Sequence, residues 1–162
     1  MKLLSDFTTS VCRAFDEIDE DWESYPGLVI CGTHAPKLED IENLVNHVKG
    51  AREDRIPFLG ICYGHQICAI EYARNVLGIK DATSEEFGIE GTFVIKRRDG
   101  LKIGFHEGES WWSNYDVAID MKKPSWFITT PAHPEYTSSI DKPHPLLVEF
   151  LSLCKIKSGN AE

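Results

Sequence analysis

The stretch Pro57–Gln66, PFLGICYGHQ, decides the fold of this chain. The apolar segment Ile56–Ile61 leads through a sharp turn at Cys62 into a helical pattern that begins at once. This order predicts a strand, a tight turn and a helix. The G-x-C-x-G spacing, with Gly60 and Gly64 on either side of the cysteine, is the cysteine counterpart of a nucleophile elbow. At such a turn the thiol lies over a helix N-terminus, where the macrodipole favours the thiolate.

Two interpretations of Cys62 are open at this point. In the first, the turn pushes a reactive thiol out above the sheet. In the second, Cys62 is a small buried hydrophobe at the end of a strand, because free cysteine is among the most buried residue types. The elbow alone favours neither.

The segments around the elbow alternate between strands and helices in their hydrophobic pattern. Such alternation predicts an α/β fold with an open, doubly wound, mainly parallel sheet flanked by helices and joined by right-handed crossovers. We expect a short strand within Met1–Leu4, a helix over Asp6–Ile18 with Asp6 as its N-cap, and a strand over Gly27–Cys31. A helix over Lys37–Gly50 follows, and the helix that begins directly after the elbow continues through Ile67 to Gly78.

The alternation stops after Asp81. Gly91–Arg97 and Leu101–Phe105 flank an Asp-Gly pair, which predicts an added β-hairpin. Further strands are expected over Tyr115–Ile119 and Ser125–Thr130. The pattern ends with a helix over Pro145–Ile156 and a flexible polar tail, residues 157–162.

Length and composition predict a single soluble domain covering residues 1–162, since 42% of the residues are hydrophobic and 27% are charged. The net charge of -9 comes with no basic patch, which speaks against a nucleic-acid partner. We find no apolar run of about 18 residues and no signal peptide, so no membrane partner is expected and the location is expected to be cytoplasmic.

The five cysteines lack the paired spacing of a metal site, and a cytosolic setting keeps thiols reduced. We therefore expect neither a metal nor disulfides. The chain also lacks a phosphate-binding loop of the G-x-x-x-x-G-K-[ST] kind, and no cofactor is expected.

A second unusual site, His133 with Glu135, follows the strand expected to end at Thr130. A cysteine nucleophile needs a base to take up its proton, and that base needs a third group to orient it. Two residues apart in an extended segment, His133 and Glu135 point the same way, which lets the carboxylate reach the imidazole. Together with Cys62, they favour a catalytic interpretation of the elbow.

At this point the sequence resembles a known family. GICYGHQ followed by HPE resembles the class I glutamine amidotransferases, whose catalytic triad is Cys, His and Glu. Within that family the similarity is greatest to the glutaminase domains of the CTP synthases. It runs through Pro57–Phe87 and His133–Phe150, and more weakly through Asp6–Phe15. The resemblance implies a flavodoxin-like fold.

By position, the resemblance implies Cys62 as nucleophile, His133 as general base and acid, and Glu135 as its orienting partner. It implies that the N–H groups of the Gly32 loop and Tyr63 form the oxyanion hole. It further implies that Gln66 and Glu86 hold the glutamine substrate, with Glu86 accepting hydrogen bonds from the α-amino group.

The sequence also departs from the family pattern. The family has two adjacent glycines in the oxyanion loop, and Cys31 stands in place of the first. The segment between Phe87 and His133 is much shorter than in the family and has no match to its arginine- and histidine-rich run. No nucleotide-binding synthetase domain is present, so an ammonia acceptor is expected on a separate protein.

These observations lead to three hypotheses. The first is a glutaminase-type amidohydrolase that releases ammonia from glutamine through a Cys62 thioester. The second keeps the triad but takes a γ-glutamyl amide or small peptide as substrate, which the shortened middle segment favours. The third is a catalytically silent binding or regulatory relative, which the departure at Cys31 and the unmatched run suggest.

Overall fold

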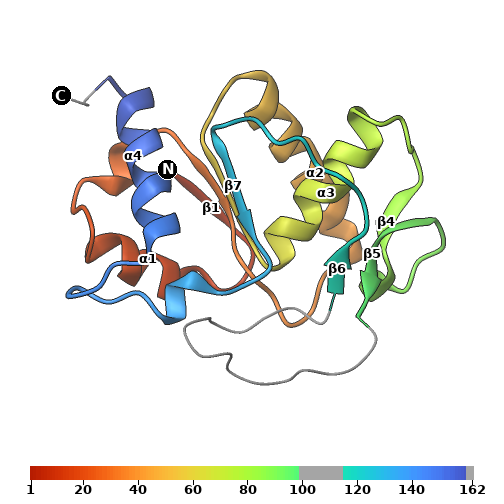
Figure 1. Cartoon of the computed structure of the whole chain (residues 1–162), viewed down its shortest axis with the longest axis horizontal. Coiled ribbons are helices and arrows are strands. Elements are labelled where there is room, and N and C mark those ends of the chain that lie inside the picture. The colour runs from red at the N-terminus through yellow and green to blue at the C-terminus, as the bar shows by residue number, and fades with distance from the viewer. Residues whose placement is uncertain (99–114, 160–162) are drawn as a thin grey trace.

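The computed structural model describes residues 1–98 and 115–159. Its main sheet is parallel and has the order β1-β2-β3-β7. The sheet is flanked by helices on both sides (Figure 1), which confirms the predicted fold class. The strands are β1 (Lys2–Leu4), β2 (Leu28–Ile30), β3 (Phe58–Ile61) and β7 (Phe127–Thr130).

Within residues 1–98 and 115–159, four α-helices divide between the two faces of the main sheet. Helices α1 and α4 pack on one face, and α2 and α3 pack on the other. Alternate side chains of β2 enter the two cores, Leu28 and Ile30 on the α2 side and Val29 on the α1 side, as strand geometry requires. The helices are α1 (Thr8–Asp16), α2 (Leu38–Glu53), α3 (Tyr63–Asn75) and α4 (Pro145–Lys157).

The connections between the first three strands differ in hand. Strands β1, β2 and β3 are neighbours in that order, so both connections step the same way across the sheet. One passes through α1 on one face and the other through α2 on the opposite face. Two such connections have opposite hands, so the expectation of uniformly right-handed crossovers is wrong for one of them.

A smaller sheet of order β4-β5-β6 lies beyond α3 (Figure 1). The sequence pattern did not predict β4, which pairs in parallel with β5, while β5 pairs antiparallel with β6. The second strand and the turn of the expected hairpin, residues 99–105, lie outside the described residues. The strands are β4 (Ala82–Ser84), β5 (Thr92–Arg97) and β6 (Tyr115–Val117).

Two expected helix ends are wrong. Helix α1 begins at Thr8, and Asp6 does not cap it, because the Asp6 carboxylate accepts a hydrogen bond from the Thr33 hydroxyl instead. Helix α2 continues through Gly50 to Glu53, since a single glycine costs a helix interior only about 1 kcal/mol.

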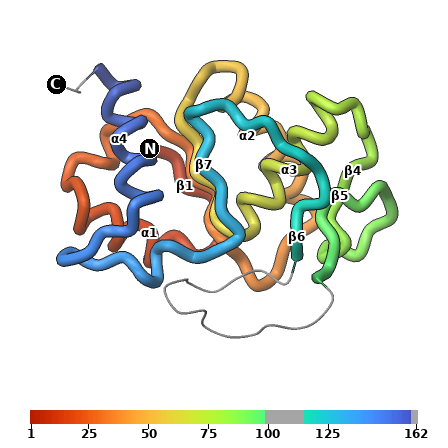
Figure 2. Tube along the Cα trace, viewed as in Figure 1, coloured from red at the N-terminus to blue at the C-terminus, as the bar shows by residue number. Residues whose placement is uncertain are grey.

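The described part of the chain also contains three short 3-10 helices, η1 (Trp22–Ser24), η2 (Glu85–Phe87) and η3 (Pro134–Tyr136). Figure 2 traces the segment after β7 through η3 and past α1 to α4. Within residues 1–98 and 115–159, none of the helices is both long enough and apolar enough to cross a bilayer.

Candidate active site

Cys62 occupies the sharp turn between β3 and α3. Its backbone has φ 52° and ψ -96°, in the left-handed half of the map that a non-glycine residue rarely enters. The Cys62 N–H donates to the carbonyl of Thr130 at the end of β7, 2.8 Å away. The elbow is therefore held by the strand that leads into His133, and the thiol sits at the N-terminus of α3.

The two glycines of the motif serve close packing and not the turn itself. A Cβ on Gly60 would lie 2.7 Å from the carbonyl oxygen of Gly64, and one on Gly64 would lie 2.1 Å from that of Ile30. Neither glycine has a positive φ. Among the elbow residues, only Cys62 has one. The sequence therefore indicated the right residues but the wrong reason for them. The glycines are needed because they let α3 approach β3 and β2 closely, and not because they form the turn.

His133 and Glu135 form the second part of the site. His133 Nδ1 and Glu135 Oε1 are 2.7 Å apart, and the Glu135 side chain is fully buried. Glu135 lies in η3 and not in an extended segment, so the turn after His133 brings the two side chains together. The other oxygen, Oε2, has no hydrogen-bond partner among the described residues. A buried carboxylate in this position favours an imidazolium beside it.

The His133 pKa follows from the burial of the ring and from two neighbouring side chains. Burial alone would lower the pKa of His133, but hydrogen bonds to the side chains of Cys62 and Glu135 and the charges of both groups raise it to about 9. His133 is therefore protonated at neutral pH. Its hydrogen bond to Cys62 places the ring beside the thiol.

Arg13 of α1 holds the backbone of the segment that carries Glu135. Its guanidinium donates to the Glu135 carbonyl at 2.8 Å and to the Ser138 carbonyl at 3.4 and 3.5 Å. The same guanidinium pairs with Glu17 at 2.7 Å. Sequence reasoning did not find Arg13, because its partners are carbonyl groups more than 100 residues away.

The loop after β2 lies directly against His133. A Cβ on Gly32 would lie 2.7 Å from His133 Cε1 and 3.0 Å from the ring of Phe7, so only glycine fits here without displacing them. The expected second donor, the N–H of Tyr63, belongs to the first turn of α3 and has no partner within that helix.

Cys31 precedes Gly32 at the end of β2. Its N–H donates to the Leu4 carbonyl at 3.0 Å, and its side chain is buried in the core between the sheet and helices α1 and α4. Burial raises the pKa of the Cys31 thiol well above its usual range. The side chain that departs from the family pattern is therefore part of the core.

Gln66 and Glu86 come from different elements and meet beside the elbow. The Gln66 amide Nε2 donates to Glu86 Oε2 at 2.5 Å. Its Oε1 accepts a hydrogen bond from the Ser84 hydroxyl at 2.8 Å. Gln66 is buried and Glu86 is exposed. Ser84 is a residue that the sequence analysis did not single out, because a serine at the end of a strand carries no motif.

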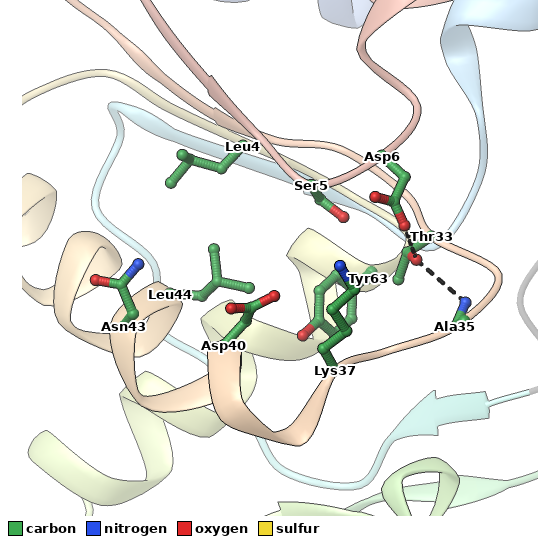
Figure 3. Close-up of a pocket in the computed structure, with 10 residues that line it drawn as sticks. All are labelled: Leu4, Ser5, Asp6, Thr33, Ala35, Lys37, Asp40, Asn43, Leu44 and Tyr63. Atoms are coloured by element: carbon green, nitrogen blue, oxygen red, sulfur yellow. Dashed lines mark hydrogen bonds between the residues drawn. The ribbon is translucent and has the colours of Figure 1, made fainter.

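A pocket of about 190 Å3 lies next to the loop after β2. Figure 3 shows it between the end of β1, the loop Thr33–Ala35 and the first turns of α2, with the Tyr63 ring facing it. The Tyr63 hydroxyl has no hydrogen-bond partner among the described residues, and burial raises the pKa of Tyr63 to about 12. The Thr33 hydroxyl donates to Asp6 at 2.5 Å and accepts from the Ala35 N–H at 3.1 Å, which ties this loop to the end of β1.

A second pocket, of about 260 Å3, opens beside His133 and is mostly aromatic. We call it the aromatic pocket, and it is lined by Phe7, His34, His133 and Tyr136. The Tyr136 ring stacks on the His133 ring with centroids 5.3 Å apart. Phe7 contacts His34 edge to face at 4.6 Å.

The described residues contain no cluster of three or more histidine, cysteine or acidic side chains that could hold a metal ion. Arg98, directly after β5, forms an ion pair with Asp116 on β6.

Comparison with known proteins places this geometry in a family. The family model described as Glutamine amidotransferase class-I matches residues 5–153. The chain is 29% identical to the CTP synthase of Bdellovibrio bacteriovorus over 169 residues, which covers 68% of this chain and 32% of that protein. It is 28% identical to the CTP synthase of Methanoculleus marisnigri over 194 residues, which covers 88% of this chain and 36% of that protein.

Among solved structures, the chain resembles the glutaminase domain of Trypanosoma brucei CTPS with bound acivicin. The TM-score is 0.71 at 19% identity, covering 96% of this chain and 92% of that chain. This likeness concerns the fold. The chain spans about a third of the length of the curated relatives it matches. Because the family model covers nearly the whole chain, this protein belongs to the class I glutamine amidotransferases.

Proposed function

We propose that this chain hydrolyses the side-chain amide of glutamine and releases ammonia. The observation that carries the proposal is the arrangement at the elbow. The Cys62 thiol sits at a helix N-terminus and is hydrogen-bonded to His133, whose Nδ1 lies 2.7 Å from the buried Glu135 carboxylate. A thiolate held beside an imidazolium is an activated nucleophile together with a ready proton donor.

In the first half of the proposed reaction, the Cys62 thiolate attacks the amide carbon of glutamine. A carbon–sulfur bond forms, and the carbonyl oxygen becomes an oxyanion that the N–H groups of Gly32 and Tyr63 stabilise. The His133 imidazolium donates its proton to the amide nitrogen. The carbon–nitrogen bond then breaks, ammonia leaves, and a γ-glutamyl thioester stays on Cys62.

In the second half, the neutral His133 takes a proton from a water molecule that attacks the thioester carbon. The new tetrahedral intermediate collapses with cleavage of the carbon–sulfur bond. Glutamate leaves, and Cys62 and His133 return to the thiolate–imidazolium pair. Glu135 keeps its position throughout and orients the ring.

The proposed substrate site pairs Gln66 with Glu86 beside the elbow. The exposed Glu86 carboxylate offers an acceptor to the α-amino group of glutamine, and the buried Gln66 amide holds that carboxylate. Together with Cys62, these residues select a substrate with a free amino group at one end and an amide at the other.

The test is incubation of the pure chain with glutamine and, separately, with acivicin, an electrophilic amino acid. We expect ammonia release and a stoichiometric adduct on Cys62, found by peptide mass analysis. Labelling without ammonia release would point to a chain that needs a partner for turnover. Neither ammonia nor an adduct would contradict the proposal and favour the silent relative.

The pH dependence provides a further prediction. Because the pKa of His133 is raised to about 9, we expect kcat/KM to fall as the pH rises through about 9 and the imidazolium loses its proton. Glu135→Gln removes one interaction that raises this pKa, so the falling limb should move to lower pH. The measurement is a pH profile between about pH 6 and pH 10, with stability measured in parallel.

The raised pKa of His133 also determines how the stability of the fold changes with pH. The folded-state pKa of His133 lies above its unfolded value of 6.5, so protonated His133 stabilises the fold fully below about pH 6.5. That contribution is lost as the pH rises through about 9. Glu149→Gln, an exposed change on α4 with the same loss of charge, is the matched control. An alkaline limb at the same pH in Glu135→Gln and Glu149→Gln would contradict the role of Glu135.

A second candidate function is hydrolysis of a γ-glutamyl amide with a leaving group larger than ammonia. The specific observation is the aromatic pocket, which adjoins the histidine that protonates the leaving group. Its volume of about 260 Å3 exceeds what ammonia requires. An aromatic or apolar amine fits this lining.

The measurement for this candidate function is the turnover rate of γ-glutamyl-p-nitroanilide divided by that of glutamine. Tyr136→Ala should lower that ratio roughly 2- to 12-fold, the equivalent of the 0.5–1.5 kcal/mol of an aromatic pair. Ile140→Ala, an exposed apolar change nearby in sequence, is the control. No turnover of the anilide by the unmodified chain would leave glutamine as the better candidate.

Other parts of the proposal rest on the relatives. Since these are CTP synthases of which the chain spans about a third, we propose that the ammonia passes to a separate synthetase. We also propose that residues 1–162 act as one domain. The cytoplasmic location stays a prediction.

A further inference from the structure

The structure assigns a role to Ser84, at the end of β4. Its side chain is fully buried, and its hydroxyl takes part in two hydrogen bonds. It donates to Gln66 Oε1 at 2.8 Å and accepts from the backbone N–H of Glu86 at 3.2 Å. Ser84 therefore connects α3 to η2 at the point where the proposed substrate-holding side chains meet.

The Glu86 carboxylate and the Ser84 hydroxyl together fix which way the Gln66 amide faces. A carboxylate oxygen only accepts hydrogen bonds, so the amide atom that faces Glu86 is the nitrogen, and the amide oxygen on the other side accepts the proton of the Ser84 hydroxyl. The amide nitrogen then points to the Glu86 carboxylate, 2.5 Å away. The reversed amide would place an oxygen against the carboxylate, where two acceptors repel each other and the buried amide loses a partner.

The acceptor of the Gln66 amide is the charged carboxylate of Glu86, which strengthens their hydrogen bond. A hydrogen bond from an amide to a carboxylate is about twice as strong as one between neutral groups. The exposed Glu86 keeps its carboxylate beside the elbow through this bond and through the N–H of its own backbone on Ser84. Loss of the Ser84 hydroxyl removes the second contact and leaves the buried amide oxygen of Gln66 without its hydrogen-bond donor.

We propose that Ser84 is a positioning residue that sets the site's selectivity for substrates with a free α-amino group. It acts through Gln66 and Glu86 and does not touch the reacting atoms. This inference rests on the proposed function. It adds that discrimination between glutamine and compounds without an amino group depends on a hydroxyl in the interior of the protein.

The test compares two electrophiles that react with Cys62. Acivicin carries an α-amino group and iodoacetamide does not. We expect Ser84→Ala to lower the second-order rate of Cys62 modification by acivicin about tenfold or more, because the aligned carboxylate is lost. The rate with iodoacetamide should stay within about twofold. In steady-state assays, the KM for glutamine should rise more than kcat falls.

Thr83 provides a matched control one residue away. Its side chain is 2% exposed, and its hydroxyl has no hydrogen-bond partner among the described residues. Thr83→Ala therefore deletes a buried hydroxyl outside this network, and we expect both electrophiles to react as with the unmodified chain. A loss of acivicin selectivity equal to that of Ser84→Ala would overturn the proposal.

A double-mutant cycle separates positioning from general damage. Glu86→Gln alone should lose the same selectivity, and Ser84→Ala should add little to it, because both act through one carboxylate. Additive losses would contradict the proposal. If Ser84→Ala does not fold, Ser84→Cys is the second variant, because its side chain has a similar shape and is only a weak donor. It should show the same loss of acivicin selectivity, measured as modification of the Cys62 peptide.

The outcomes also separate this inference from the proposed function. An unmodified chain that does not react with acivicin contradicts the proposed function. An unmodified chain that reacts, together with a Ser84→Ala variant that keeps its preference for acivicin, contradicts only the role of Ser84.

Discussion

Cys62→Ala is expected to abolish ammonia release from glutamine, with kcat/KM falling by a factor on the order of 10³ or more. The reason is chemical, since alanine cannot form the thioester through which the proposed reaction passes. The fold should persist, because Cys62 is only half-buried and the turn is held through its backbone N–H. The measurement is ammonia production at saturating and subsaturating glutamine, with thermal unfolding recorded for both proteins.

Cys12→Ala is the matched control for this prediction. Cys12 is also a half-buried free cysteine, but it lies on α1 and outside the elbow. We expect it to keep its turnover and its acivicin adduct. Ammonia release that survives in Cys62→Ala would remove Cys62 from the mechanism.

Gly64→Ala is expected to have the largest effect on stability. Its new Cβ would lie 2.1 Å from the carbonyl oxygen of Ile30, a backbone atom of β2 that cannot move without displacing the strand. We expect the free energy of unfolding to fall by roughly 3 kcal/mol or more, as for other severe overpacking at a buried site. The measurement is equilibrium denaturation of the variant and the unmodified chain.

Gly50→Ala makes the same chemical change with the opposite expected sign. Gly50 lies inside α2, and a Cβ there has no atom within 4 Å. Alanine in a helix interior is more favourable than glycine by about 0.5–1 kcal/mol, so the variant should be slightly more stable. Equal changes in the two variants would contradict the close packing of α3 on β2.

Much of the main sheet was predictable because it is encoded locally. Apolar runs bounded by glycine and proline indicated β2, β3 and β7, and residues three and four apart indicated the helices. The strand β4 was missed because its three residues, Ala82–Ser84, show no alternation. The hand of the connection through α1 was also missed, since it depends on the face of the sheet that a helix covers and not on the pattern of that helix.

Some residues of the candidate site were also predictable from the sequence, and others were not. Cys62, His133 and Glu135 were found from two short motifs, and the structure brings these side chains together. Arg13 and Ser84 were not found, because each acts through groups distant in sequence and carries no motif of its own. Glu135 also reaches His133 from a 3-10 turn and not from an extended segment.

The sequence by itself determined the elbow, its cysteine and the alternation of strands and helices, because these depend on residues close together along the chain. Only the tertiary structure decided that the pKa of His133 is raised, since that pKa reflects burial, the 3-10 turn that brings Glu135 to the ring, and Cys62 from another segment of the chain. It also decided how the Gln66 amide faces, because a buried amide turns toward the donors and acceptors that surround it, and Ser84 and Glu86 come from a different part of the chain.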